Sequence, residues 1–161
     1  MQIDRGLLGL YLADHLSGAT AGVERVERMA QSYEDLPVHA DLVLLRDELR
    51  QEHQRLQQII ERQGTHRRPL RQAAGWVGEK LGRLKFNRRL VRRSPYSVVL
   101  ELELLRGAVM AKQGLWQSLH DLAGPLGLDA DELDRLTEAA TVQRERLERM
   151  HATVRTDAFG R

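Results

Sequence analysis

The stretch HRRPLRQAAGWVGEKLGRLKFNRRLVRRS, residues 66–94, lies between two pairs of predicted helices and decides how the chain is expected to fold. It carries ten of the 25 Lys and Arg residues and a single acid, Glu79. Antiparallel helices of a bundle are usually joined by about two to eight residues, so a segment this long can run from one end of a bundle to the other. We expect a crossover over 64–94, in which Pro69 opens a short helix at about 69–84.

On both sides of this crossover, apolar residues recur at alternating spacings of three and four, the period of an amphipathic helix. The pattern predicts four helices, at about 7–33, 38–63, 95–123 and 130–156. Gly64 suits a left-handed C-cap, and Ser94 suits an N-cap because Pro95 follows at the first helical position. Asp129 and Glu132 have the spacing of a capping box, which marks the start of the last helix.

The composition fits one helical domain over residues 1–161. Apolar residues make up 42% of the chain and aromatic residues 4%, so the helices must bury long aliphatic stripes against one another. The absence of Cys excludes disulfides and thiolate metal sites. No apolar run is long enough to cross a bilayer, and the start has no signal-peptide layout. We therefore expect an all-α four-helix bundle that is soluble and cytoplasmic.

Two antiparallel helices, a long crossover and two more antiparallel helices resemble the layout of the ferritin-like superfamily. The sequence ELRQEHQRL at 48–56 is similar to the carboxylate-and-histidine second helix of that superfamily, and Glu148 with His151 has its Glu-x-x-His spacing. The chain therefore resembles a divergent bacterial member. The resemblance implies a ferritin-like fold and a pair of iron or manganese ions held by carboxylates and histidines of the four helices.

Most of the ligand positions that the resemblance implies are altered in this chain. At 100° per residue, Glu24 falls on the outer side of the first helix. The residue three before His53 is Arg50 rather than Glu, and Glu52 lies only at the edge of its apolar stripe. Glu148 is turned away from the stripe of the fourth helix. We therefore expect a degraded ligand set and no cofactor, with iron, manganese or zinc as the alternative.

Polar residues interrupt the apolar stripes, and buried polar groups need partners. They are His15, His53, Glu101, Lys112 and Gln143, with His151 at a margin. The antiparallel first and second helices should bring His15 and His53 to one level. A crossover would bring Lys112 to these histidines and would pair Glu101 with His151 at the opposite end. Simple up-down-up-down winding would instead gather all three histidines and Glu101 into a credible zinc or iron site.

Three functions remain open from the sequence. The leading one is a non-catalytic ferritin-like bundle that acts as a binding or assembly module. The first alternative is a metal-handling protein or oxidoreductase that uses His15, His53, Glu101 and His151. The second alternative is a polyanion-binding protein, in which the crossover contacts nucleic acid or anionic membrane. Its candidate residues are Arg83, Lys85, Arg88, Arg89, Arg92 and Arg93. The same cations could bind acidic helix faces of another protein or of a second copy, which would give a homo-oligomer.

Charge reversal tests the polyanion alternative. Replacing Arg88, Arg89, Arg92 and Arg93 by Glu should lower the affinity for labelled DNA or for anionic vesicles by about tenfold or more. The variant would contact fewer phosphates and would therefore release fewer counter-ions on binding. Fluorescence anisotropy and vesicle sedimentation over a salt series measure the effect. Equal affinity of the variant and the unmodified chain would contradict this alternative.

Overall fold

The computed structural model describes residues 2–64 and 94–160, and these form helices and no strand. The helices are α1 (Arg5–Ser32), α2 (His39–Gln63), α4 (Pro95–Asp121), α5 (Ala123–Leu126) and α6 (Ala130–Phe159). The expected all-α class is confirmed for this part of the chain, and the four long helices lie close to the expected ranges. The short helix expected at about 69–84 lies outside the described residues.

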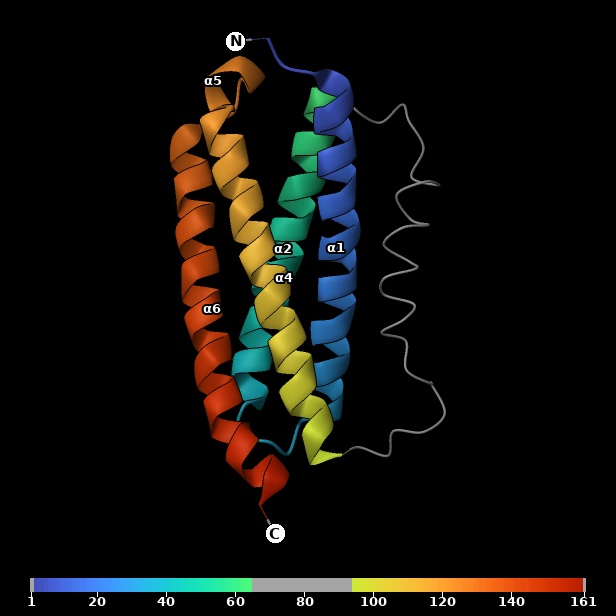
Figure 1. The fold of residues 1–161 in the computed structure, drawn as a ribbon, viewed down its shortest axis with the longest axis vertical. Helices are drawn as coiled ribbons and strands as arrows, with labels where there is room; N and C mark the ends of the chain where they lie inside the picture. The colour runs from blue at the N-terminus through green and yellow to red at the C-terminus, as the bar shows by residue number, and fades with distance from the viewer. Residues whose placement is uncertain (1, 65–93, 161) are drawn as a thin grey trace.

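The four long helices lie side by side along a common axis (Figure 1). α1 and α2 run in opposite directions, as do α4 and α6, whereas α2 and α4 run in the same direction. α2 therefore ends and α4 begins at opposite ends of the molecule, which agrees with a crossover and not with up-down-up-down winding. α1 packs mainly on α2, α4 packs mainly on α6, and α2 and α6 pack on each other only sparsely.

The helix ends follow the local sequence with two exceptions, and one of them is Ser94, which stands at the N-cap position of α4 but makes no side-chain capping hydrogen bond. Gly64 closes α2 with φ +65°, a left-handed conformation that glycine adopts without a Cβ penalty. Asp129 caps α6 by accepting a hydrogen bond from the backbone N–H two residues on. The expected capping box is not completed, because the Glu132 carboxylate binds the Arg55 guanidinium of α2 at 2.5 and 2.7 Å.

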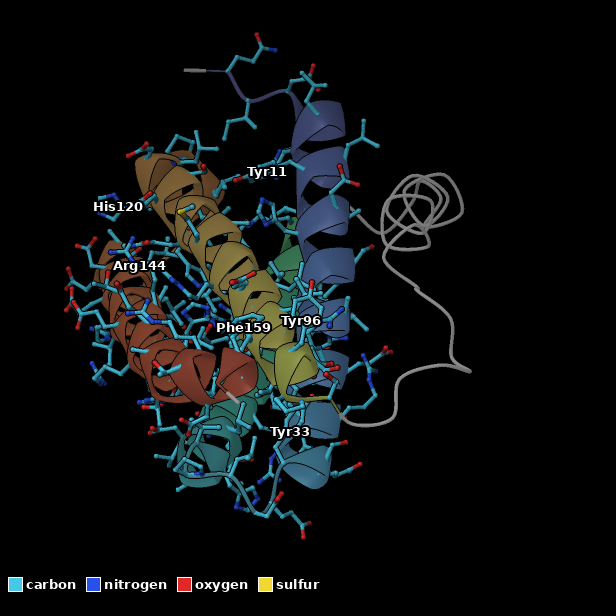
Figure 2. The ribbon with its side chains drawn as sticks, turned by 60° about the horizontal axis from the view of Figure 1, so that its bottom comes forward. Tyr11, Tyr33, Tyr96, His120, Arg144 and Phe159 are labelled. Carbon is cyan, nitrogen blue, oxygen red and sulfur yellow. The ribbon has the colours of Figure 1, made fainter. Side chains whose placement is uncertain are left out.

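The apolar core has two parts. One lies toward the ends where α1 stops and α4 starts, and includes Met29, Leu45 and Leu102. There Tyr96 and Phe159 make an edge-to-face pair with ring centroids 6.3 Å apart, at the start of α4 and the end of α6 (Figure 2). The other part lies toward the opposite end and is built around residues such as Leu12, Ile59, Trp116 and Leu119. Buried polar side chains lie between the two parts.

Within residues 2–64 and 94–160, no helix is long and apolar enough to cross a membrane.

The core packing predicts a contrast between two leucines of α4. Leu102 is fully buried and Leu100 is 37% exposed. Leu102→Ala should lower the free energy of unfolding by about 2–5 kcal/mol through lost burial and a residual cavity, whereas Leu100→Ala should cost about 0.5 kcal/mol. Urea unfolding followed by circular dichroism measures both values, and similar losses in the two variants would contradict this packing.

Candidate functional site

A closed polar network lies in the middle of the molecule, between the two parts of the apolar core. The Lys112 ammonium of α4 donates to a Glu52 carboxylate oxygen of α2 and to the Gln143 side-chain oxygen of α6. Gln143 Nε2 in turn donates to the second Glu52 oxygen at 2.8 Å. Glu52 is 7% exposed and Gln143 is 1% exposed. Three helices are thus joined by one buried cation, one buried anion and one amide.

The network satisfies the strict requirement that a buried charge has a partner. Removing an ion from water costs several kcal/mol, and only an opposite charge with further hydrogen bonds offsets that cost. Burial lowers the pKa of Lys112, and the Glu52 carboxylate acts in the opposite direction. The sequence placed Lys112 and Gln143 in their apolar stripes, and both side chains do lie in the interior. The prediction of Glu52 at a stripe edge was wrong, because this side chain is buried.

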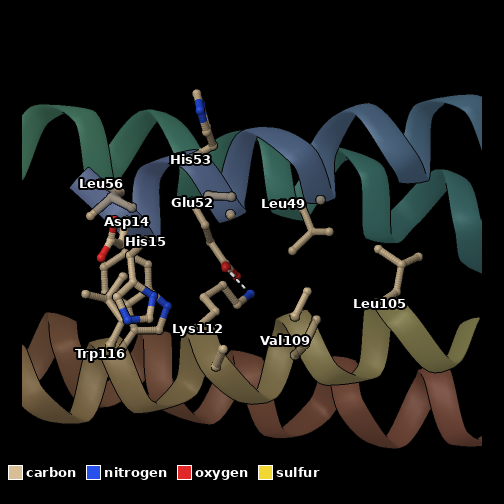
Figure 3. A pocket seen from close by; sticks show the side chains of 16 residues that line it. Asp14, His15, Leu49, Glu52, His53, Leu56, Leu105, Val109, Lys112 and Trp116 are labelled. Carbon is tan, nitrogen blue, oxygen red and sulfur yellow. Dashed lines mark hydrogen bonds and ion pairs between the residues drawn. The ribbon is translucent and has the colours of Figure 1, made fainter. Parts of the chain in front are cut away.

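A cavity of about 250 Å³ lies beside this network, between α1, α2 and α4 (Figure 3). Its walls are largely apolar, with Leu49, Leu56 and Val109 among them. Glu52 and Lys112 also line it, and their charged ends point toward one another among the surrounding side chains. Because an apolar cavity of about 150 Å³ can already hold benzene, this one has room for a larger small molecule.

Small residues of α1 create the space. Gly18, Ala19 and Gly22 face the cavity, where long side chains at the same positions would fill it. A Cβ built on Gly18 or Gly22 meets no atom within 4 Å. These glycines therefore do not serve close helix packing. They leave a hollow in the face of a helix, and the helix tolerates them although each costs roughly 1 kcal/mol relative to Ala.

Three side chains with ring nitrogens line the cavity, namely His15, His53 and Trp116. His15 lies 4.5 Å from the ring of Tyr11 in an edge-to-face contact, and burial lowers the pKa of its imidazole, against a smaller opposing effect of Asp14. Burial therefore favours the neutral imidazole over the charged form. Trp116 is 1% exposed, and its Nε1–H has no acceptor among the described residues.

His53 also lines the cavity, and its ring contacts Thr20 of α1. The Thr20 hydroxyl donates its single hydrogen to the Leu16 carbonyl at 2.9 Å. The same hydroxyl oxygen lies 2.9 Å from His53 Nε2, which joins α1 and α2 at this level. The sequence expected His15 and His53 at one level, and they line one cavity from adjacent helices.

The other two candidate metal ligands lie elsewhere. Glu101 accepts a hydrogen bond of 2.7 Å from the Tyr33 hydroxyl and lies 3.6 Å from Arg25. His151 Nε2 lies 3.1 Å from a Glu103 oxygen. The expected pair of Glu101 and His151 is therefore wrong, since each finds another partner. Among the described residues, no three His, Asp or Glu side chains converge on a point where they could hold a metal ion.

The opposite side of the network faces a second, more open hollow of about 540 Å³ between α2 and α6, which Glu52 and Gln143 also line. Two arginine bridges span these helices. Arg55 binds Glu132, and Arg146 donates to both Glu48 oxygens at 2.9 Å. These bridges join α2 and α6, which pack on each other only sparsely, and they leave the network between two hollows.

Comparison of the chain with protein-family models, with curated proteins and with solved structures found no match to any of them. The candidate anion-binding residues of the crossover lie outside the described part of the chain. They are Arg83, Lys85, Arg88, Arg89, Arg92 and Arg93.

Removing the buried cation should destabilise the fold far more than removing an exposed one. Lys112→Met leaves the Glu52 carboxylate buried without a counter-charge, and we expect a loss of about 3–5 kcal/mol in the free energy of unfolding. Arg28→Met is the matched control, because Arg28 forms an exposed pair with Glu24 at 3.9 Å and should cost about 0.5 kcal/mol.

Adding Glu52→Gln to Lys112→Met removes the orphaned charge and should recover part of the loss. Urea unfolding of the single and double variants measures both effects. A loss in Lys112→Met no larger than that in Arg28→Met would show that the ion pair is not a constraint on the fold.

Proposed function

We propose that the chain is a non-catalytic, ferritin-like four-helix bundle that acts as a binding module for a small apolar molecule. The observation that carries this proposal is the apolar cavity between α1, α2 and α4, which opens beside a polar network whose groups are already paired. Ligand sites in proteins are typically concave and mostly apolar, with a few polar groups that orient the ligand. The cavity has this composition.

The directions of the helices support the ferritin-like part of the proposal. α2 and α4 run in the same direction and are flanked by the antiparallel partners α1 and α6. This connection requires one long crossover, as in ferritin-like folds. The sequence resemblance at 48–56 lies on α2, and it includes the buried Glu52 and the cavity-lining His53.

Lys112 supports a role that does not depend on a metal. The resemblance implies inward carboxylates that would hold metal cations, and Glu52 is the inward carboxylate at this level. Its cation comes from the chain itself, because the Lys112 ammonium donates to it. A second cation at the same oxygen would meet the repulsion of that ammonium. Stoichiometric iron, manganese or zinc that resists chelation in the purified protein would contradict this proposal.

Filling the cavity should abolish binding without damaging the fold. An apolar probe such as p-xylene should raise the melting temperature of the unmodified chain, because ligand binding stabilises only the folded state. Gly22→Leu should remove this rise, since the new side chain enters open space and takes the place of the probe.

Gly107→Leu is the matched control. Gly107 lies on α4, does not line the cavity, and also has no atom within 4 Å of a built Cβ. The variant should keep the full response to p-xylene. Differential scanning calorimetry with and without the probe measures all three proteins. No rise in the unmodified chain, or an equal rise in Gly22→Leu, would contradict binding in this cavity.

A further inference from the structure

We propose that Lys112 binds the ligand covalently, as a reversible imine with an apolar aldehyde. This inference rests on the proposed function, because it names the ligand class and the attachment point of the same cavity. Lys112 belongs to α4, lines the cavity, and carries its amine to the centre of the lining residues (Figure 3). It is the one lysine in the described part of the chain.

The surroundings of the Lys112 amine favour formation of an imine. The walls around the amine are largely apolar, and the Lys112 side chain is 13% exposed. Imine formation releases water, so apolar surroundings favour the condensed product. Burial also lowers the pKa of Lys112, which increases the share of the nucleophilic free amine relative to an exposed lysine.

Glu52 can accept a proton from Lys112 and later return it. Its oxygen accepts a hydrogen bond from Lys112 Nζ, so it can take one ammonium proton and leave a free amine. The nitrogen lone pair attacks the aldehyde carbon, a C–N bond forms, and a proton passes from the nitrogen to the carbonyl oxygen, which becomes the hydroxyl of a carbinolamine. Glu52 returns the proton to that hydroxyl, water leaves, and a protonated imine remains. The sum is aldehyde plus ammonium giving iminium plus water, with no oxidant or reductant.

The product keeps the charge that the core requires. An iminium carries the same single positive charge as the ammonium, so the Glu52 carboxylate remains paired after the ligand is bound. Gln143 stays bound to the other Glu52 oxygen at 2.8 Å and holds the carboxylate in place. The apolar part of the aldehyde fills the space beside Gly18 and Gly22, where no side chain projects.

Reductive trapping tests the proposal on the full chain. The protein is incubated with 4-methylbenzaldehyde and sodium cyanoborohydride near neutral pH, and peptide mass spectrometry locates the reduced adduct. Lys80, Lys85 and the amino terminus are internal controls, because they are the only other primary amines of the chain. Lys112 should be labelled at an aldehyde concentration at least about tenfold lower than these controls, as expected for a depressed pKa and a local binding site.

Two variants tie the labelling to the cavity. Gly22→Leu should reduce labelling of Lys112 to the level of Lys80 and Lys85, and Gly107→Leu should leave it unchanged. Gly18→Leu serves in place of Gly22→Leu if circular dichroism shows that the latter does not fold. Preferential labelling that persists in the cavity-filled variant would overturn the proposal, because the aldehyde would then reach Lys112 by another route.

The matched probe p-xylene separates this inference from the proposed function, since it has the shape of the aldehyde and no carbonyl group. If p-xylene binds and Lys112 is labelled no more readily than Lys80 and Lys85, the imine is wrong and the binding function stands. If neither probe binds, both proposals fail.

Discussion

The buried ammonium of Lys112 is the constraint on which the rest of the structure depends. A cation in the middle of a helical core must have an anion at contact distance, and Glu52 provides it from α2 while Gln143 of α6 ties both groups together. The three helices can therefore slide along one another only by breaking charged hydrogen bonds in a low dielectric. Apolar contacts alone would allow the helices to pack at several relative positions along their axes. The network can form at only one of these positions.

The network also explains where the cavity lies. α1 is the one long helix that sends no side chain to it, and at this level α1 carries glycine and alanine in place of large residues. The core is therefore interrupted on the α1 side by a hollow with apolar walls and a charged pair beside it. Closely packed cores contain few such voids. A void that small residues maintain on one helix, next to a paired lysine, is the feature on which the proposed ligand binding rests.

Much of the fold followed from the sequence, because helix periodicity and end signals are local. Gly64 closed α2 as expected, and the length of the crossover agreed with the parallel directions of α2 and α4. The site was predicted in part. His15, His53 and Lys112 line one cavity, as the crossover arrangement predicted, whereas Glu52 was buried rather than marginal and Glu132 turned from its capping position to Arg55. A helical wheel gives only the direction of each Cβ. The end of a long side chain such as Glu can lie well away from that direction.

The sequence by itself determined the helical class, the positions of the long helices and the set of polar residues that the apolar stripes must accommodate, since each depends on a period of 3.6 residues and on local caps. Only the tertiary structure decided which of these polar groups meet. Glu101 binds Tyr33 and His151 lies against Glu103, because partners are chosen by the distance between side chains on different helices. The cavity belongs to the same category. From the sequence alone, a glycine in a helix indicates only lower helix stability. The placement of α2 and α4 opposite it shows that the missing side chain leaves a hollow.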